Sequence, residues 1–133
     1  SRSWAGESVK KKAIRQYIDA VGRGDAAAIQ SVVTEDYTHE FLGTTVLRGK
    51  RSLADILGQL DAFMAALARP GEFTFQEMVE EGDIVSAMFS GKCELANGKR
   101  FDGDYAIFCH FRGDKILTMR ELIDTKLADS VLG

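Results

Sequence analysis

The chain has 133 residues, of which 45% are hydrophobic and 28% are charged, and its formal net charge is −3. This length and composition are typical of one ordinary globular domain with its own core, and they exclude a disordered chain. The slightly acidic balance leaves no broad basic face, so we expect no nucleic-acid partner.

The first part of the chain has the periodicity of α-helices. Apolar residues recur at helical spacing over residues 8–21. Gly24 is predicted to end this helix, because glycine readily adopts the left-handed conformation found at helix ends. Asp25 then caps a second, short helix over residues 26–33. The arm that precedes both helices carries Trp4 and is expected to be loose, although Trp4 is able to fold back on the domain.

A short strand and a third helix are predicted next. Residues 37–41 form the strand, and residues 43–49 form a loop that contains a short hairpin strand around Val46. Ser52 and Asp55 resemble a helix-capping pair. A strong apolar stripe follows them at helical spacing, so we predict a long third helix.

Pro70 is the only proline of the chain and separates helices from strands. After it the hydrophobic period changes from 3.6 to 2, which indicates strands. Tight turns, one of them with an Asn-Gly pair, join these strands, so consecutive strands pair antiparallel. A short tail that starts at Asp124 is predicted to begin as a helix. The four strands cover residues 72–80, 84–95, 100–111 and 116–123.

The order of the elements predicts the α+β class. Helices that precede a run of hairpin-linked strands pack on one face of the sheet. A long, twisted antiparallel sheet curls, and three helices laid on it leave a pocket suited to a small molecule. We therefore expect a single domain over residues 1–133 with a curved, mainly antiparallel sheet and three helices packed over a pocket.

Several stretches resemble a known superfamily. Residues 15–21 with the turn at Gly24 resemble the first helix of ketosteroid isomerases, residues 35–43 resemble their first strand, and residues 115–120 resemble their last strand. The ending over residues 120–125 is similar to SnoaL-like polyketide cyclases. The resemblance covers nearly the whole chain and implies the cone-shaped α+β barrel of the nuclear transport factor two-like superfamily, with cofactor-free chemistry.

The resemblance also implies catalytic residues. Tyr17 matches the tyrosine that donates a hydrogen bond to the substrate oxygen in ketosteroid isomerases. The isomerase aspartate that acts as base falls on Phe41, or on Glu40 after a slip of one residue. Because successive strand residues face opposite sides, either Glu40 or the pair His39 and Phe41 points into the pocket. His39 is a natural general base if it faces inward, since an imidazole titrates near neutral pH.

Two further positions leave alternatives open. The second isomerase carboxylate falls near Ile107 or Phe108, neither of which donates a hydrogen bond, and this favours a non-catalytic binder. Asp124 matches the acid/base aspartate of SnoaL-like cyclases, but it also suits the N-cap of the tail helix. Arg120 pairs with Asp124 at the rim or binds an anionic substrate.

These observations predict a cofactor-independent acid/base enzyme with isomerase, cyclase or dehydratase chemistry on a small, apolar, carbonyl-bearing substrate. The alternative is a non-catalytic small-molecule-binding protein of the same fold. A homodimer through the exposed sheet face is expected in either case. The predicted catalytic residues are Tyr17, His39, Glu40 and Asp124, and the predicted substrate-binding residues are Phe41, Leu57, Phe63, Phe75, Met119 and Arg120.

Other sequence features predict neither a cofactor nor a membrane segment. The chain has no glycine-rich phosphate loop and no metal-binding motif, so we expect no cofactor and no metal. No apolar run is long enough to cross a bilayer, and no signal-peptide pattern is present. Cys93 and Cys109 lie in apolar strand patterns and are expected to be free, buried thiols in a cytoplasmic, reducing environment.

Overall fold

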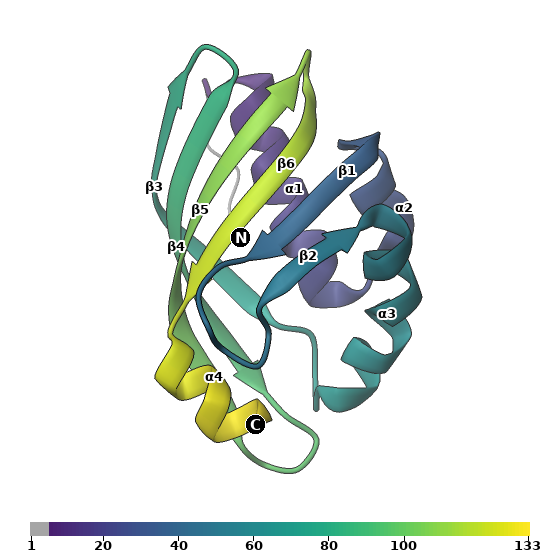
Figure 1. Cartoon of the computed structure of the whole chain (residues 1–133), viewed down its shortest axis with the longest axis vertical. Coiled ribbons are helices and arrows are strands. Elements are labelled where there is room, and N and C mark those ends of the chain that lie inside the picture. The colour runs from purple at the N-terminus through teal and green to yellow at the C-terminus, as the bar shows by residue number, and fades with distance from the viewer. Residues whose placement is uncertain (1–5) are drawn as a thin grey trace.

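The computed structural model describes residues 6–133, so the arm predicted around Trp4 lies outside the described residues. The described part of the chain forms four helices and six strands (Figure 1). In chain order they are α1 (Val9–Arg23), α2 (Ala26–Gln30), β1 (Val33–Phe41), β2 (Gly49–Ser52), α3 (Leu53–Ala66), β3 (Glu72–Glu81), β4 (Ile84–Glu94), β5 (Arg100–Arg112), β6 (Lys115–Ile123) and α4 (Thr125–Leu132).

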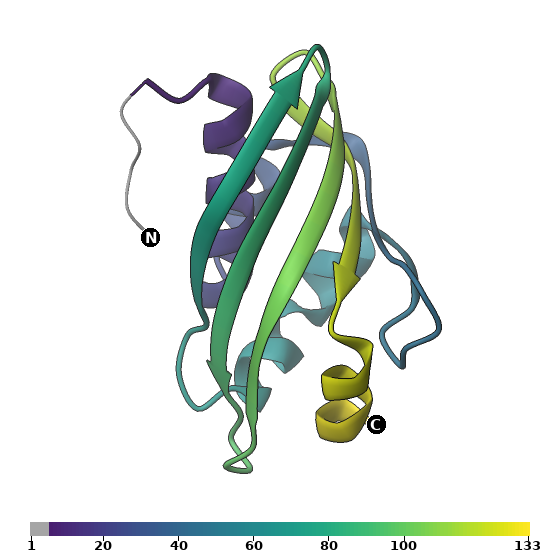
Figure 2. The ribbon, with the colours of Figure 1, turned by 90° about the vertical axis from the view of Figure 1, so that its left-hand side faces the viewer.

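The strands form one curved sheet in the order β2-β1-β6-β5-β4-β3. All neighbours pair antiparallel except β1 and β6, which run parallel. Helices α1, α2 and α3 lie on one face of the sheet, and α4 lies at its lower end beside the loop between β1 and β2 (Figures 1 and 2). The predicted α+β class and the curved, mainly antiparallel sheet are confirmed, but the sheet stays open rather than closing into a barrel.

Local signals explain where the helices begin and end. The Ser8 side chain caps α1 by accepting a hydrogen bond from the Lys11 backbone, and Gly24 ends α1 with φ of 70°. Ser52 and Asp55 form the predicted capping box of α3. The tail is a helix from Thr125, as expected at its start.

Two predicted boundaries near the first strand are wrong. Strand β1 begins at Val33, so the second helix ends earlier than predicted. The hairpin strand β2 covers Gly49–Ser52 rather than the region around Val46, because β2 pairs with the end of β1 and not with the loop.

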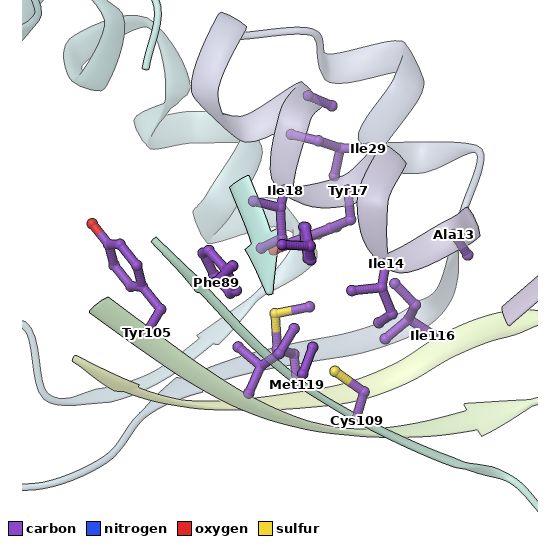
Figure 3. Close-up of a cluster of buried hydrophobic side chains, with 14 of the residues drawn as sticks. Ala13, Ile14, Tyr17, Ile18, Ile29, Phe89, Tyr105, Cys109, Ile116 and Met119 are labelled. Carbon is purple, nitrogen blue, oxygen red and sulfur yellow. The ribbon is translucent and has the colours of Figure 1, made fainter. Parts of the chain in front are cut away.

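The core lies between the inner face of the sheet and the helices (Figure 3). Helices α1 and α2 contribute buried side chains from one side, and strands β4, β5 and β6 contribute them from the other. Both cysteines are free and buried within this layer, as predicted. Among the described residues no helix is both long enough and apolar enough to cross a membrane. The labelled core residues are Ala13, Ile14, Tyr17, Ile18, Ile29, Phe89, Tyr105, Cys109, Ile116 and Met119.

Candidate functional site

A cavity of about 150 Å³ opens between the inner face of the sheet, α1 and α3. Its wall is apolar and rich in aromatic rings, so a bound molecule would exchange water for carbon surface. The α3 residue Phe63, Leu47 of the β1–β2 loop and the α4 residue Leu132 also contribute to the wall. Further aromatic residues of the wall are Phe41, Phe73, Phe89, Phe101 and Tyr105.

Three of the polar side chains in this mostly apolar wall form one hydrogen-bonded chain. The Tyr17 hydroxyl lies 2.9 Å from His39 Nδ1. On the other side of the imidazole, His39 Nε2 lies 2.7 Å from Glu121 Oε1. All three residues line the cavity, with His39 6% and Glu121 5% exposed and Tyr17 fully buried.

The fold brings these three residues together from distant parts of the sequence. Tyr17 lies on the buried stripe of α1, which packs against the sheet. The parallel pairing of β1 with β6 sets His39 beside Met119 and Phe41 beside Glu121. Because every second residue of a strand faces the same side, His39 and Glu121 become diagonal neighbours on the inner face.

One assignment of donors and acceptors satisfies the whole hydrogen-bonded chain. In it the Glu121 carboxylate accepts from the Nε2–H group of His39, which leaves the Nδ1 lone pair to accept from the Tyr17 hydroxyl. Burial raises the pKa of Tyr17 above its ordinary value, so this hydroxyl keeps its proton. Glu121 Oε2 accepts no hydrogen bond from the part of the chain that the structure describes.

The imidazole ring is also held by packing. The Phe41 ring stacks on His39 with centroids 4.7 Å apart and planes 15° from parallel. The Arg51 guanidinium lies over the Phe41 ring, 4.9 Å from its centroid. His39 is therefore fixed by two hydrogen bonds and one stacking contact. Within residues 6–133 no cluster of three His, Cys, Asp or Glu side chains is arranged to hold a metal ion.

The sequence matches one known domain family over most of its length. The model of the SnoaL-like domain matches residues 14–119. The chain belongs to the SnoaL-like domain family. No curated protein matches the sequence.

Solved structures resemble this SnoaL-like domain over nearly its full length. Bal32a, from a soil-derived mobile gene cassette, is 18% identical with a TM-score of 0.77, and the match covers 92% of this chain and 95% of Bal32a. TerC, co-crystallised with polyporic acid, is 21% identical with a TM-score of 0.75 and coverages of 90% and 94%. IdmH from Streptomyces antibioticus, a protein assigned as a polyketide cyclase, is 18% identical with a TM-score of 0.72 and coverages of 93% and 98%. At these identities the likeness establishes the fold alone.

The structure of the SnoaL-like domain places only some of the predicted site residues at the cavity. Tyr17, His39, Phe41 and Phe63 line it. Glu40 is half-buried and is not among the lining residues, because the alternation of β1 turns His39 and Phe41 inward.

Two charged residues that were predicted at the site lie elsewhere. The side chain of Asp124 accepts a hydrogen bond from the Leu127 backbone at 3.0 Å and caps α4, so the capping alternative agrees with the structure. Arg120 is exposed on the opposite face of β6 from Glu121, and no ion pair joins it to Asp124 in the described residues.

Three apolar residues that were predicted to bind substrate pack instead in the core of the SnoaL-like domain. Phe75 stacks on Phe89 with centroids 5.0 Å apart, and Met119 is fully buried. Leu57 is half-buried on α3 and packs against the core. None of the three lines the cavity.

Sequence reasoning missed two polar residues of the cavity, Glu121 and Tyr105. A signal for Glu121 was present in strand β6. Met119 was predicted to face the pocket, and strand alternation puts Glu121, two residues later, on the same side. The family resemblance instead drew attention to Asp124, three residues beyond Glu121 and past the end of the strand.

Proposed function

We propose that this SnoaL-like domain is a cofactor-independent acid/base enzyme that acts on a small, mostly apolar, carbonyl-bearing substrate. The observation that carries the proposal is the hydrogen-bonded chain Tyr17–His39–Glu121 in a mostly apolar cavity. Burying polar groups away from water is unfavourable, so an apolar binding pocket gains nothing in stability from them. Isomerase, cyclase and dehydratase chemistry all need such a group to move a proton.

In this proposal Glu121 is the general base and His39 positions it. Glu121 Oε2 takes a proton from the carbon next to the substrate carbonyl, and the electron pair of that C–H bond forms a C=C bond while the carbonyl π pair moves to oxygen. The protonated Glu121 then returns the proton to another carbon in an isomerisation, or to a departing hydroxyl in a dehydration. His39 keeps its Nε2–H bond to Oε1, which fixes the orientation of the carboxyl group.

We propose a positioning role for Tyr17 in place of the oxygen-binding role implied by the resemblance. Its hydroxyl is fully buried and is directed at His39 Nδ1. A donor at Nδ1 keeps the imidazole proton on Nε2, where it faces Glu121. Tyr17 therefore acts through His39.

A pH–rate study with matched carboxylate variants tests the proposal. The substrates are a panel of enones, epoxides and β-keto esters. Glu121→Gln keeps the size of the side chain and removes the base, so the rate should fall by about 10²–10⁴-fold. Glu40→Gln makes the same change on the other face of β1 and should leave the rate unchanged. The proposal fails if no panel member turns over, or if Glu121→Gln is as active as Glu40→Gln.

The second candidate function is non-catalytic binding of a small apolar molecule. Phe41 at the position of the isomerase base favours it, and so does the aromatic wall of the cavity. The structural neighbour TerC was crystallised with polyporic acid, which supports a ligand in a cavity of this fold. This function predicts that Glu121→Gln binds ligands as tightly as the wild type and that neither protein converts them.

We also propose that the outer face of the sheet forms a homodimer. Met88, Phe108 and Leu122 are exposed there on the adjacent strands β4, β5 and β6, and Val79 is exposed on β3. Exposed apolar side chains gathered on one face of a sheet are typical of a protein interface. Analytical ultracentrifugation should find a dimer in the wild type and a monomer in Leu122→Glu. A monomeric wild type at tens of micromolar would contradict this proposal.

The free cysteines support a cytoplasmic location, which we propose because Cys93 and Cys109 are both buried and unpaired. Reducing compartments keep such thiols free. Fractionation of the native host cells, followed by immunoblotting, should find the protein in the cytoplasmic fraction, and recovery from an oxidising compartment would contradict the proposal.

A further inference from the structure

Tyr105 is the polar residue of the cavity that the Tyr17–His39–Glu121 chain does not include. It lies on β5, lines the cavity and is 9% exposed. In Figure 3 its hydroxyl points from the sheet toward the helix layer and away from Met119 and Cys109. In the described part of the chain this hydroxyl has no hydrogen-bond acceptor, so it is available to a bound molecule.

Three phenylalanine rings hold the Tyr105 ring in place. Phe89 stacks on it with centroids 4.8 Å apart and planes 8° from parallel. Phe101 stacks at 6.4 Å, and Phe73 meets it edge to face at 6.1 Å. A donor held this firmly needs no reorganisation when charge develops on its acceptor, which is the condition for electrostatic stabilisation of a transition state.

Tyr105 and Glu121 face the same cavity from neighbouring strands. In the antiparallel pairing of β5 with β6, Tyr105 lies opposite Ile123, and Ile107 lies opposite Glu121. Tyr105 and Glu121 are therefore diagonal neighbours on one face, at a backbone separation of about 7–8 Å that long side chains bridge. One small molecule placed between them contacts both a hydroxyl donor and a carboxylate.

Burial keeps the Tyr105 hydroxyl protonated. It raises the pKa of Tyr105 well above its ordinary value, and the nearby Glu121 and Asp102 carboxylates act in the same direction. The group is thus a neutral donor over the working pH range and does not compete with Glu121 for the role of base.

We propose that Tyr105 donates a hydrogen bond to the carbonyl oxygen of the ligand and, in the enzyme, is a second catalytic residue opposite Glu121. When Glu121 removes the proton from the neighbouring carbon, the C–H electron pair forms the new C=C bond and the carbonyl π pair moves to oxygen. The Tyr105 hydroxyl holds this enolate oxygen and keeps its own proton. The catalytic part of this inference rests on the proposed function, whereas the oxygen-binding part does not.

Infrared spectroscopy of ¹³C-carbonyl acetophenone, used as the probe, tests oxygen binding without any turnover. The wild type should shift the carbonyl stretch to lower wavenumber, and Tyr105→Phe should lose the shift because only the donor is removed. Tyr37→Phe is the matched control, since Tyr37 is buried, lies outside the cavity lining and packs against Tyr17 rather than Tyr105. Identical bands in the wild type and Tyr105→Phe, or no binding of acetophenone to the wild type, would overturn the inference.

Kinetics separate this inference from the proposed function. On a panel substrate that turns over, Tyr105→Phe should lower kcat by about 10²–10³-fold, as expected for one lost oxyanion donor. If Glu121→Gln abolishes turnover and Tyr105→Phe leaves kcat unchanged, the inference about Tyr105 fails while the proposed function stands. If the carbonyl shift depends on Tyr105 but the panel shows no turnover, oxygen binding stands and the proposed enzyme fails.

Discussion

Replacing the whole polar chain should disturb the fold far less than breaking it at one point. The test compares His39→Leu and Glu121→Leu with the triple variant in which Tyr17 also becomes Phe. In the wild type the side chains of His39 and Glu121 are 8% and 7% exposed and lie 2.7 Å apart. Each partner has therefore given up most of its water for the other.

The expected magnitudes follow from which group is left behind. His39→Leu leaves the buried Glu121 carboxylate without its hydrogen-bond donor, which costs at least about 1–3 kcal/mol because the group left behind is charged. Glu121→Leu leaves the imidazole Nε2–H group without an acceptor, at about 1–3 kcal/mol. In the triple variant no polar atom of the chain remains, and replacing hydrogen-bonded partners by apolar groups of similar shape is nearly neutral or stabilising.

Urea unfolding of the four proteins measures these differences, because a single domain of this size is expected to unfold in one cooperative step. The reasoning is refuted if the triple variant loses as much stability as the two single variants together. That result would mean that the chain is retained because it stabilises the fold. A triple variant that is stable and inactive on the substrate panel is the expected outcome.

Two further predictions concern the wall of the cavity and its closure. A Cβ at Gly91 would lie 3.0 Å from Tyr105 Cε1, so Gly91→Ala should destabilise the protein by about 1–3 kcal/mol through overpacking. Gly58→Ala on the open side of α3 is the control and should not destabilise the protein. Equal urea midpoints for the two variants would contradict this prediction. The Asp129 side chain accepts hydrogen bonds from the backbone of the β1–β2 loop and from Thr45, which lower its pKa and fasten α4 to that loop. This contribution is present above the ordinary pKa of Asp129 and is lost as the pH falls through the lowered value, so amide exchange in α4 should accelerate there, and Asp129→Ala should exchange fast at every pH.

Most of the fold was predictable because its signals are local. The capping box of Ser52 and Asp55 joins residues three apart, and both of its hydrogen bonds are present. The end of α3 is less local, since Leu67 leaves the helix to form an isolated bridge with Leu95. The pairing of β1 with β6 could not be predicted from the sequence, because the predicted hairpins link only consecutive strands.

The inward face of β1 was undecided for a physical reason. The register between β1 and β6 shifts between Val33 and Thr38, so the side-chain alternation at the start of the strand does not carry through to its end. His39 shares its face with the apolar residues Tyr37 and Phe41, but the resemblance allowed a slip of one residue and so kept Glu40 as an alternative. The partner strand β6 decides which side chain faces inward, because it carries Glu121, the hydrogen-bond partner of His39, 82 positions later in the chain.

Glu121 is the residue at which pattern and function disagree. The inner face of β6 otherwise carries Ile116, Met119 and Ile123, all buried, so a carboxylate there breaks the expected apolar sequence. His39 breaks the same pattern on β1. Two unrelated polar residues on apolar faces would not be expected to lie next to each other, yet the parallel pairing of β1 with β6 brings His39 and Glu121 to hydrogen-bonding distance inside the cavity. Because a buried pair of this kind gives no dependable gain in stability, its position is better explained by proton transfer at the cavity than by folding.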